Sequence, residues 1–110
     1  MRLRYPILLL LFSLKLLSQE VQTIAFYNVE NLFDSRNDPK TFDDDYTPKG
    51  RNHWTPALVN QKIDQIAQVL SGVGKRETKR PPLLIGLAEV ENRTVLEQLV
   101  AHPKLRPYGY

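Results

Sequence analysis

The chain contains no cysteine among its 110 residues. This absence excludes a disulfide, a thiolate metal site, a cysteine nucleophile and a lipid-modified cysteine. Oxygen and nitrogen atoms remain as the possible metal ligands. Any metal is therefore expected to be a hard cation such as Mg2+ or Mn2+.

The sequence also lacks an apolar run of the length that a membrane-spanning helix needs, which is about 20 residues. Its apolar stretch, residues 7–17, is shorter and is interrupted by Lys15. Two arginines precede this stretch and Ser18 follows it, an order typical of a secretory signal peptide. We expect residues 1–18 to be a signal peptide of an exported, periplasmic or extracellular protein without a stable membrane anchor. The alternative is an N-terminal core helix.

The sequence also lacks a net charge once residues 1–18 are set aside. The formal charge of +3 comes from 15 basic and 12 acidic residues, and three of the basic residues lie within residues 1–18. Residues 19–110 therefore carry 12 charges of each sign, so bulk charge supplies no argument for a polyanionic partner. No protein partner is evident either. Their length suits one small domain.

Two segments have the composition of buried strands. Residues 21–30 and 83–89 are rich in apolar and β-branched side chains, and both end in polar residues. Between them, Thr55 and Pro56 form a helix start signal, and apolar residues then recur every three or four positions as far as Gly72. This spacing predicts a helix over residues 56–72.

A second helix is predicted after the second strand. It begins at Asn92 or at Thr94, and Thr94 with Glu97 has the spacing of a capping box. The resulting order of strand, helix, strand and helix predicts a layered α/β fold.

Two charged segments are predicted to lie on the surface. Residues 34–54 form a long loop, and loops of this length in compact domains are usually functional or mobile. Its run of three aspartates, residues 43–45, lacks the ligand spacing of an EF-hand and is interpreted as a solvated acidic turn. Residues 75–80 are interpreted as a solvated connection. Their alternative role is contact with a polyanionic backbone.

Polar side chains mark the ends of both predicted strands, with Asn28 and Glu30 on the first and Glu89 and Glu91 on the second. The carboxyl ends of strands form the ligand crevices of α/β folds. Asn28 and Glu30 share a face if the strand alternates regularly. Carboxylate and amide oxygens suit Mg2+. The alternative is that these residues only mark where the strands leave the core.

The sequence FYNVENLFD at residues 26–34, paired with GLAEVEN at residues 86–92, resembles the endonuclease/exonuclease/phosphatase family. Residues 42–50 and 53–55 resemble the loop of a secreted bacterial branch. The resemblance implies that residues 19–110 are the N-terminal part of a DNase I-like four-layer α/β sandwich. It further implies a metal-dependent phosphoester hydrolase, in first place an endonuclease acting on nucleic acid, with Mg2+ or Mn2+ as cofactor.

The same resemblance assigns roles by position. Glu89 would be a direct metal ligand, Asn28 would orient the substrate phosphate and the metal-bound water, and Glu30 would lie near the metal. The family's catalytic histidine and general base lie in later segments, and neither His53 nor His102 matches that histidine. We therefore expect the C-terminal catalytic part to be absent and the chain alone to be inactive.

Two other functions remain open. The first is a phosphatase that acts on a phosphorylated lipid, sugar or inositol, and the second is a non-catalytic remnant that binds a phosphorylated ligand. Without a covering second sheet, the four apolar side chains of Ile24, Phe26, Leu84 and Ile85 would form an exposed patch. Aggregation or dimerisation of the chain is the expected consequence.

Overall fold

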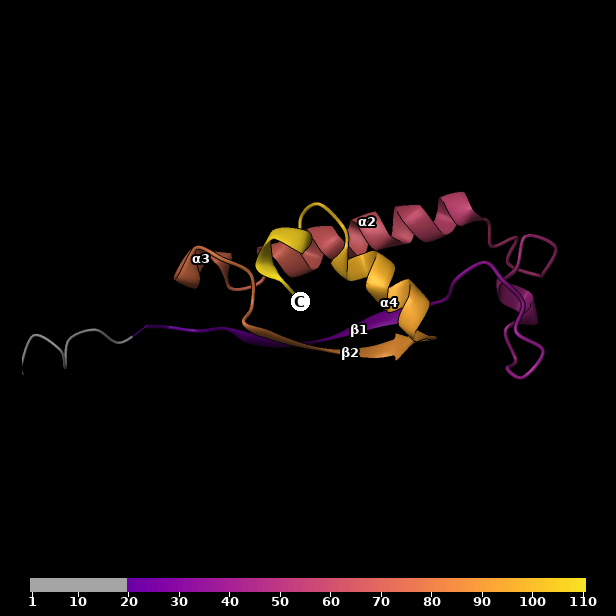
Figure 1. Cartoon of the computed structure of the whole chain (residues 1–110), viewed down its shortest axis with the longest axis horizontal. Coiled ribbons are helices and arrows are strands. Elements are labelled where there is room, and N and C mark those ends of the chain that lie inside the picture. Colours follow the sequence, from indigo (N-terminus) through magenta and orange to yellow (C-terminus); the bar gives the residue numbers. More distant parts are fainter. Residues whose placement is uncertain (1–19) are drawn as a thin grey trace, which may run out of the picture.

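The computed structural model describes residues 20–110, which form one sheet layer and one helix layer (Figure 1). Strands β1 (Ile24–Leu32) and β2 (Leu84–Val90) pair in parallel as a two-stranded sheet. This arrangement confirms the α/β class, and the four-layer sandwich stays a prediction. The predicted signal peptide lies outside the described residues. Within residues 20–110, no helix has the length and apolar character needed to cross a membrane.

Helix α2 (Pro56–Gly72) lies along the sheet and agrees with the predicted range. The side chain of Thr55 accepts a hydrogen bond from the backbone N–H of Leu58 at 3.3 Å, which caps the helix start. All five members of the predicted apolar stripe are buried: Val59, Ile63, Ile66, Ala67 and Leu70. The stripe therefore faces the sheet, as its spacing requires.

Helix α4 (Arg93–Val100) follows β2 directly and begins after Asn92. The Asn92 side chain caps it by accepting a hydrogen bond from the backbone N–H of Val95 at 3.0 Å. The predicted capping box at Thr94 is wrong, because Glu97 instead pairs with Arg93 one turn earlier at 2.7 Å. Of the two predicted start points, Asn92 is the correct one.

Residues 75–80 are solvated as predicted, and within them residues 75–78 form the short helical turn α3 (Lys75–Thr78), which has no buried residue. It is bounded by Gly74 and Lys79, which have left-handed φ angles of 68° and 62°. The remaining short elements are the 3-10 turns η1 (Asp44–Tyr46) and η2 (Arg106–Tyr108).

The hydrophobic core lies between the helices and one face of the sheet. Besides the α2 stripe, it contains Val29, Leu32, Val95, Leu99 and Leu105. Burial of these side chains supplies the main driving force for this packing. The core therefore fixes both helices on a single face of the sheet (Figure 1).

The opposite face of the sheet is open and apolar. Ile24, Phe26 and Leu84 are 72%, 76% and 61% exposed, and the Phe26 ring lies against Gly86. Ile85 was expected on this face as well, but it packs against the core. The difference follows from strand alternation, since neighbouring residues of a strand point to opposite faces.

Candidate active site at the strand ends

The carboxyl ends of β1 and β2 meet at one edge of the sheet because the strands are parallel. Asn28 lies opposite Ala88, and its Nδ2 donates a hydrogen bond to Oε1 of Glu89 at 2.8 Å. Two residues 61 positions apart in the sequence are thereby in direct contact. The structure thus brings together the amide and the carboxylate that the sequence placed at separate strand ends.

The backbone around this contact is irregular. Glu30, Asn31 and Glu89 have positive φ angles of 54°, 63° and 62°, and the strand register shifts between Asn28 and Leu32. A non-glycine residue in this region costs on the order of 1–3 kcal/mol. Three such residues within one contact cluster mark the edge as a place where the fold retains strain, a pattern common at functional sites.

The irregular backbone orients the Glu89 carboxylate through both of its oxygens. Oε1 accepts the hydrogen bond from Asn28, and Oε2 accepts one from the backbone N–H of Asn31 at 3.1 Å. Asn28 is itself fixed, because its Oδ1 accepts a hydrogen bond from the backbone N–H of Glu30 at 2.8 Å. The carboxylate is therefore held by strand β1 although it belongs to strand β2.

Regular alternation predicts that Asn28 and Glu30 share a face, and burial follows that pattern, since both are exposed and Val29 between them is buried. The register shift and the positive φ of Glu30 mark the end of the regular strand at this point. The Glu30 side chain is exposed, and its backbone carbonyl accepts a hydrogen bond from Nζ of Lys62. Its role beside a metal stays a prediction.

The donors at this edge fit a hard divalent cation that keeps most of its waters. Within residues 20–110, no group of three or more Asp, Glu or His side chains is arranged to hold a metal ion. Mg2+, however, is commonly bound by one or two carboxylates, with water and substrate phosphate as the other ligands. An exposed, oriented carboxylate such as that of Glu89 meets this requirement.

A second polar network joins the long loop to the end of β2. Oε2 of Glu91 accepts a hydrogen bond from the backbone N–H of Asp34 at 2.9 Å, and Nδ2 of Asn92 donates to Oδ2 of Asp34 at 3.0 Å. The pKa of Glu91 is raised from its ordinary 4.5 to about 7, chiefly by burial. The hydrogen bond from the Asp34 N–H opposes this rise, and the nearby carboxylates of Asp34 and Asp43 contribute to it. Glu91 therefore serves as an anchor for the loop.

Asp43 corrects the prediction of a fully solvated acidic turn. It is 1% exposed, and its two carboxylate oxygens accept the backbone N–H of Asp38 at 3.2 and 2.9 Å. Its neighbours Asp44 and Asp45 are exposed as expected. No local signal distinguishes Asp43 from its neighbours, because the three adjacent residues are all aspartates and only loop packing selects one of them for burial.

Aromatic side chains fix the other side of the loop. The rings of Phe33 and Tyr46 stack with centroids 4.0 Å apart, and Trp54 meets Tyr46 edge to face at 6.0 Å. The Trp54 Nε1 donates a hydrogen bond to the Phe33 carbonyl at 3.0 Å. Both ends of the long loop are thus held at the strand ends, Asp34 by Glu91 and Asn92 and Trp54 by Phe33.

Neither histidine lies in the Asn28–Glu89 cluster. Nε2 of His102 contacts Oδ1 of Asp64 on α2 at 2.9 Å, which ties the C-terminal segment to that helix. His53 lies in the long loop with a left-handed φ of 47°. The site in residues 20–110 therefore contains an amide and carboxylates.

Comparison with known proteins agrees with this geometry. A family model described as the endonuclease/exonuclease/phosphatase family matches residues 23–110. The chain belongs to this family. Its members are phosphoester hydrolases that generally depend on a divalent metal. The matched residues include both strands and both strand-end motifs. No curated protein and no solved structure matches the chain.

Proposed function

We propose that the strand-end site is part of the catalytic centre of a nuclease that hydrolyses phosphodiesters in nucleic acid with Mg2+ or Mn2+. The observation that carries this proposal is the Asn28–Glu89 hydrogen bond, which joins the two family motifs at one edge of the sheet. Family membership supplies the reaction class. The proposal adds two points to this reaction class, namely nucleic acid as the substrate and Mg2+ or Mn2+ as the ion.

In this proposal, Glu89 holds the divalent cation and Asn28 orients the substrate. When bound, the cation supplies Lewis-acid stabilisation of the charge that develops on the phosphate. An asparagine amide has two hydrogens, and the contact with Glu89 uses one of them. The other remains for a phosphate oxygen or a water molecule. Glu30 is the remaining candidate for contact with the cation or its waters.

The hydrogen bonds that Glu89 receives explain why it suits this role. Both carboxylate oxygens are fixed by strand β1, so little side-chain freedom is lost when a cation binds. Each oxygen keeps capacity for one further interaction. Asn28 is held by Glu30 in turn, so the amide and the carboxylate form one preorganised unit.

The first prediction is that Glu89→Gln weakens Mn2+ binding about 100-fold and that Asn28→Ala weakens it about tenfold. The first change removes the ligand charge at nearly constant shape, and the second removes only a group that orients the ligand. Binding is measured by electron paramagnetic resonance titration of the 110-residue chain. Glu77→Gln is the matched control, since Glu77 is exposed on α3 and lies outside the cluster.

Hydrolysis is the second readout. It is measured as Mg2+-dependent nicking of supercoiled plasmid by protein expressed from the full reading frame. Glu89→Gln should lower turnover while Glu77→Gln does not. Unchanged Mn2+ affinity and unchanged nicking in Glu89→Gln would refute the proposed metal site. Selective cleavage of phosphomonoesters would instead favour the phosphatase.

Export is a separate proposal, which rests on the order of basic, apolar and small residues in residues 1–18. Protein secreted by a bacterial host should have a mature N-terminus at or close to Gln19. Mass spectrometry of the periplasmic and extracellular fractions measures it. An intact Met1 on protein that stays in the cytoplasm would contradict export.

A further inference from the structure

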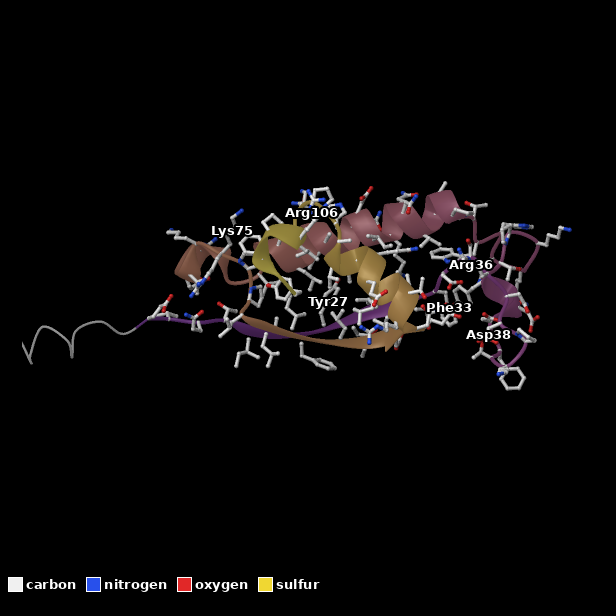
Figure 2. The ribbon with its side chains drawn as sticks, viewed as in Figure 1. Tyr27, Phe33, Arg36, Asp38, Lys75 and Arg106 are labelled. Carbon is white, nitrogen blue, oxygen red and sulfur yellow. The ribbon has the colours of Figure 1, made fainter. Side chains whose placement is uncertain are left out.

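The end of the molecule opposite the strand-end site is strongly basic. The segments 71–80 and 103–108 together contain six basic residues and one acidic residue, Glu77. The fold brings these segments together beside the carboxyl end of α2. Figure 2 shows Lys75 and Arg106 at this end and Arg36 and Asp38 at the other.

A groove of about 450 Å3 separates the two basic segments. Lys75 and Lys104 line it from opposite segments, and Ser71 at the end of α2 also lines it. Tyr108 also lines the groove and is 48% exposed. The groove therefore offers two cations and one aromatic ring to the same ligand.

Tyr108 also lines an adjoining cavity of about 350 Å3. Arg80 and Tyr110 line this second cavity, and Tyr110 is 39% exposed. The two cavities thus share Tyr108 and together are lined by three basic residues and two tyrosines, with Arg80 paired to Glu20 at 2.5 Å. We call the surface formed by Lys104, Lys75, Tyr108, Arg80 and Tyr110 the basic groove.

We propose that the basic groove binds a single-stranded segment of nucleic acid, with Tyr108 stacking on a base and Lys75 and Lys104 contacting phosphates. Proteins that bind single strands combine a basic groove along the backbone with aromatic side chains on which bases stack. The bases of a duplex are stacked inside it and cannot reach a ring in a groove. An unpaired segment is therefore the form of nucleic acid that fits.

Concavity and aromatic content favour nucleic acid over an anionic membrane surface. A bilayer surface is broad and cannot enter a groove lined on both sides, whereas a strand can. The carboxyl end of the α2 dipole attracts cations to this place in any case. That attraction accounts for one or two lysines, but it gives no reason for two exposed tyrosines in the same groove.

This inference rests on the proposed function and deepens it, since it names a single strand as the form of nucleic acid that is bound, through a surface remote from the metal site. Electrostatic contact with phosphates needs no divalent cation. Binding can therefore be measured in EDTA, where the proposed catalytic step is blocked. Failure of the groove and failure of the metal site are then distinguishable.

The experiment measures fluorescence anisotropy of a labelled single-stranded oligothymidylate of about 12 nucleotides with the 110-residue chain in EDTA. The double variant Lys75→Gln/Lys104→Gln should reduce the slope of log affinity against log salt by about 1.4 and lower affinity about 25-fold at 0.1 M salt. Glutamine at residue 104 keeps a polar group near Gln68, which Lys104 contacts. The control Lys40→Gln/Lys49→Gln removes the same charge from the exposed long loop and should bind as the native chain does.

Tyr108→Leu separates stacking from charge. It should lower affinity at least about fivefold and leave the salt slope unchanged, because it removes a stacking surface but no phosphate contact. If the double variant melts at a lower temperature than the native chain, Lys75→Gln alone decides the charge arm, with an expected slope change of about 0.7.

Three results would overturn the proposal. They are equal loss of affinity in the groove and loop double variants, absence of oligonucleotide binding by the native chain, and stronger binding to phosphatidylglycerol vesicles than to the oligonucleotide. Glu89→Gln should bind the oligonucleotide in EDTA as tightly as the native chain. Loss of nicking with intact oligonucleotide binding would locate the fault in the metal site alone.

Discussion

The two ends of the sheet have opposite charge and different backbone order. At the carboxyl ends of the strands, residues 30–45 and 89–91 contain eight of the 12 acidic residues of residues 19–110, whereas the other end has a basic groove. Nine residues of β1 separate them, a distance of about 30 Å. Residues 19–110, whose formal charges cancel, therefore have an uneven charge distribution once folded, and each end can attract a different partner.

The largest expected effect concerns the backbone at the basic end. A Cβ atom on Gly74 would lie 2.2 Å from Oγ1 of Thr23, and Gly74 has a left-handed φ. Gly74→Ala should lower the free energy of unfolding by about 3 kcal/mol, because strain and overlap act together. Urea unfolding measures it.

Gly109→Ala is the matched control for that change. Gly109 also has a left-handed φ, of 72°, but nothing lies within 4 Å of its Cβ position. It should cost only the strain, about 1 kcal/mol. Equal losses in the two variants would show that contact with Thr23 adds nothing and that the basic end is as loosely packed as the C-terminal turn.

The next effect concerns the acidic end and depends on pH. The folded chain binds the Glu91 proton more tightly than the unfolded chain, because burial raises the pKa to about 7. The stability contributed by this proton is complete below pH 4.5 and is lost as the pH rises through 7. Glu91→Gln should remove this decline and make the chain more stable than the native one at pH 8.

Urea unfolding in EDTA at pH 4.5, 6 and 8 measures the difference between the native chain and Glu91→Gln. Glu77→Gln at the basic end serves as the control, since Glu77 is exposed on α3. A constant difference between the native chain and Glu91→Gln across these pH values would contradict the raised pKa. A parallel change in Glu77→Gln would show that the effect is not confined to the acidic end.

The smallest effect on stability is expected between the two ends, on the open face of the sheet. Phe26→Lys should change the free energy of unfolding by less than about 0.5 kcal/mol, because the ring is 76% exposed. It should nevertheless reduce association of the chain, since it breaks the patch formed with Ile24 and Leu84. Size-exclusion chromatography over a range of concentrations measures association, with Phe42→Lys in the exposed long loop as control.

Local signals in the sequence determined much of the fold. Thr55, Pro56 and the apolar stripe predicted α2 at its observed bounds, because capping and helical periodicity depend on neighbouring residues. The two strands were predicted within one to three residues of their bounds. The resemblance of the two motifs predicted the family, which the match over residues 23–110 confirms.

The sequence predicted that Asn28 and Glu89 lie close together, but it did not predict the hydrogen bond between them. Parallel pairing brings strand ends together without specifying which atoms meet. The contact forms where the strand register shifts after Asn28 and where Glu30, Asn31 and Glu89 have positive φ angles, and both features belong to the folded chain. Burial of Asp43 and the anchoring role of Glu91 likewise depend on how the long loop packs against β2.

The sequence by itself determined the helices, the strands, the family and the residue types at the site, because those depend on local propensity and on residue spacing within the chain's own motifs. Tertiary structure alone decided where the charges lie. Residues 19–110 contain equal numbers of acidic and basic residues, so their composition supplied no argument for a polyanionic partner, yet folding placed Lys75 and Lys104 on the lining of one groove. Electrostatic potential depends on distances in space, and a sequence lists charges without those distances.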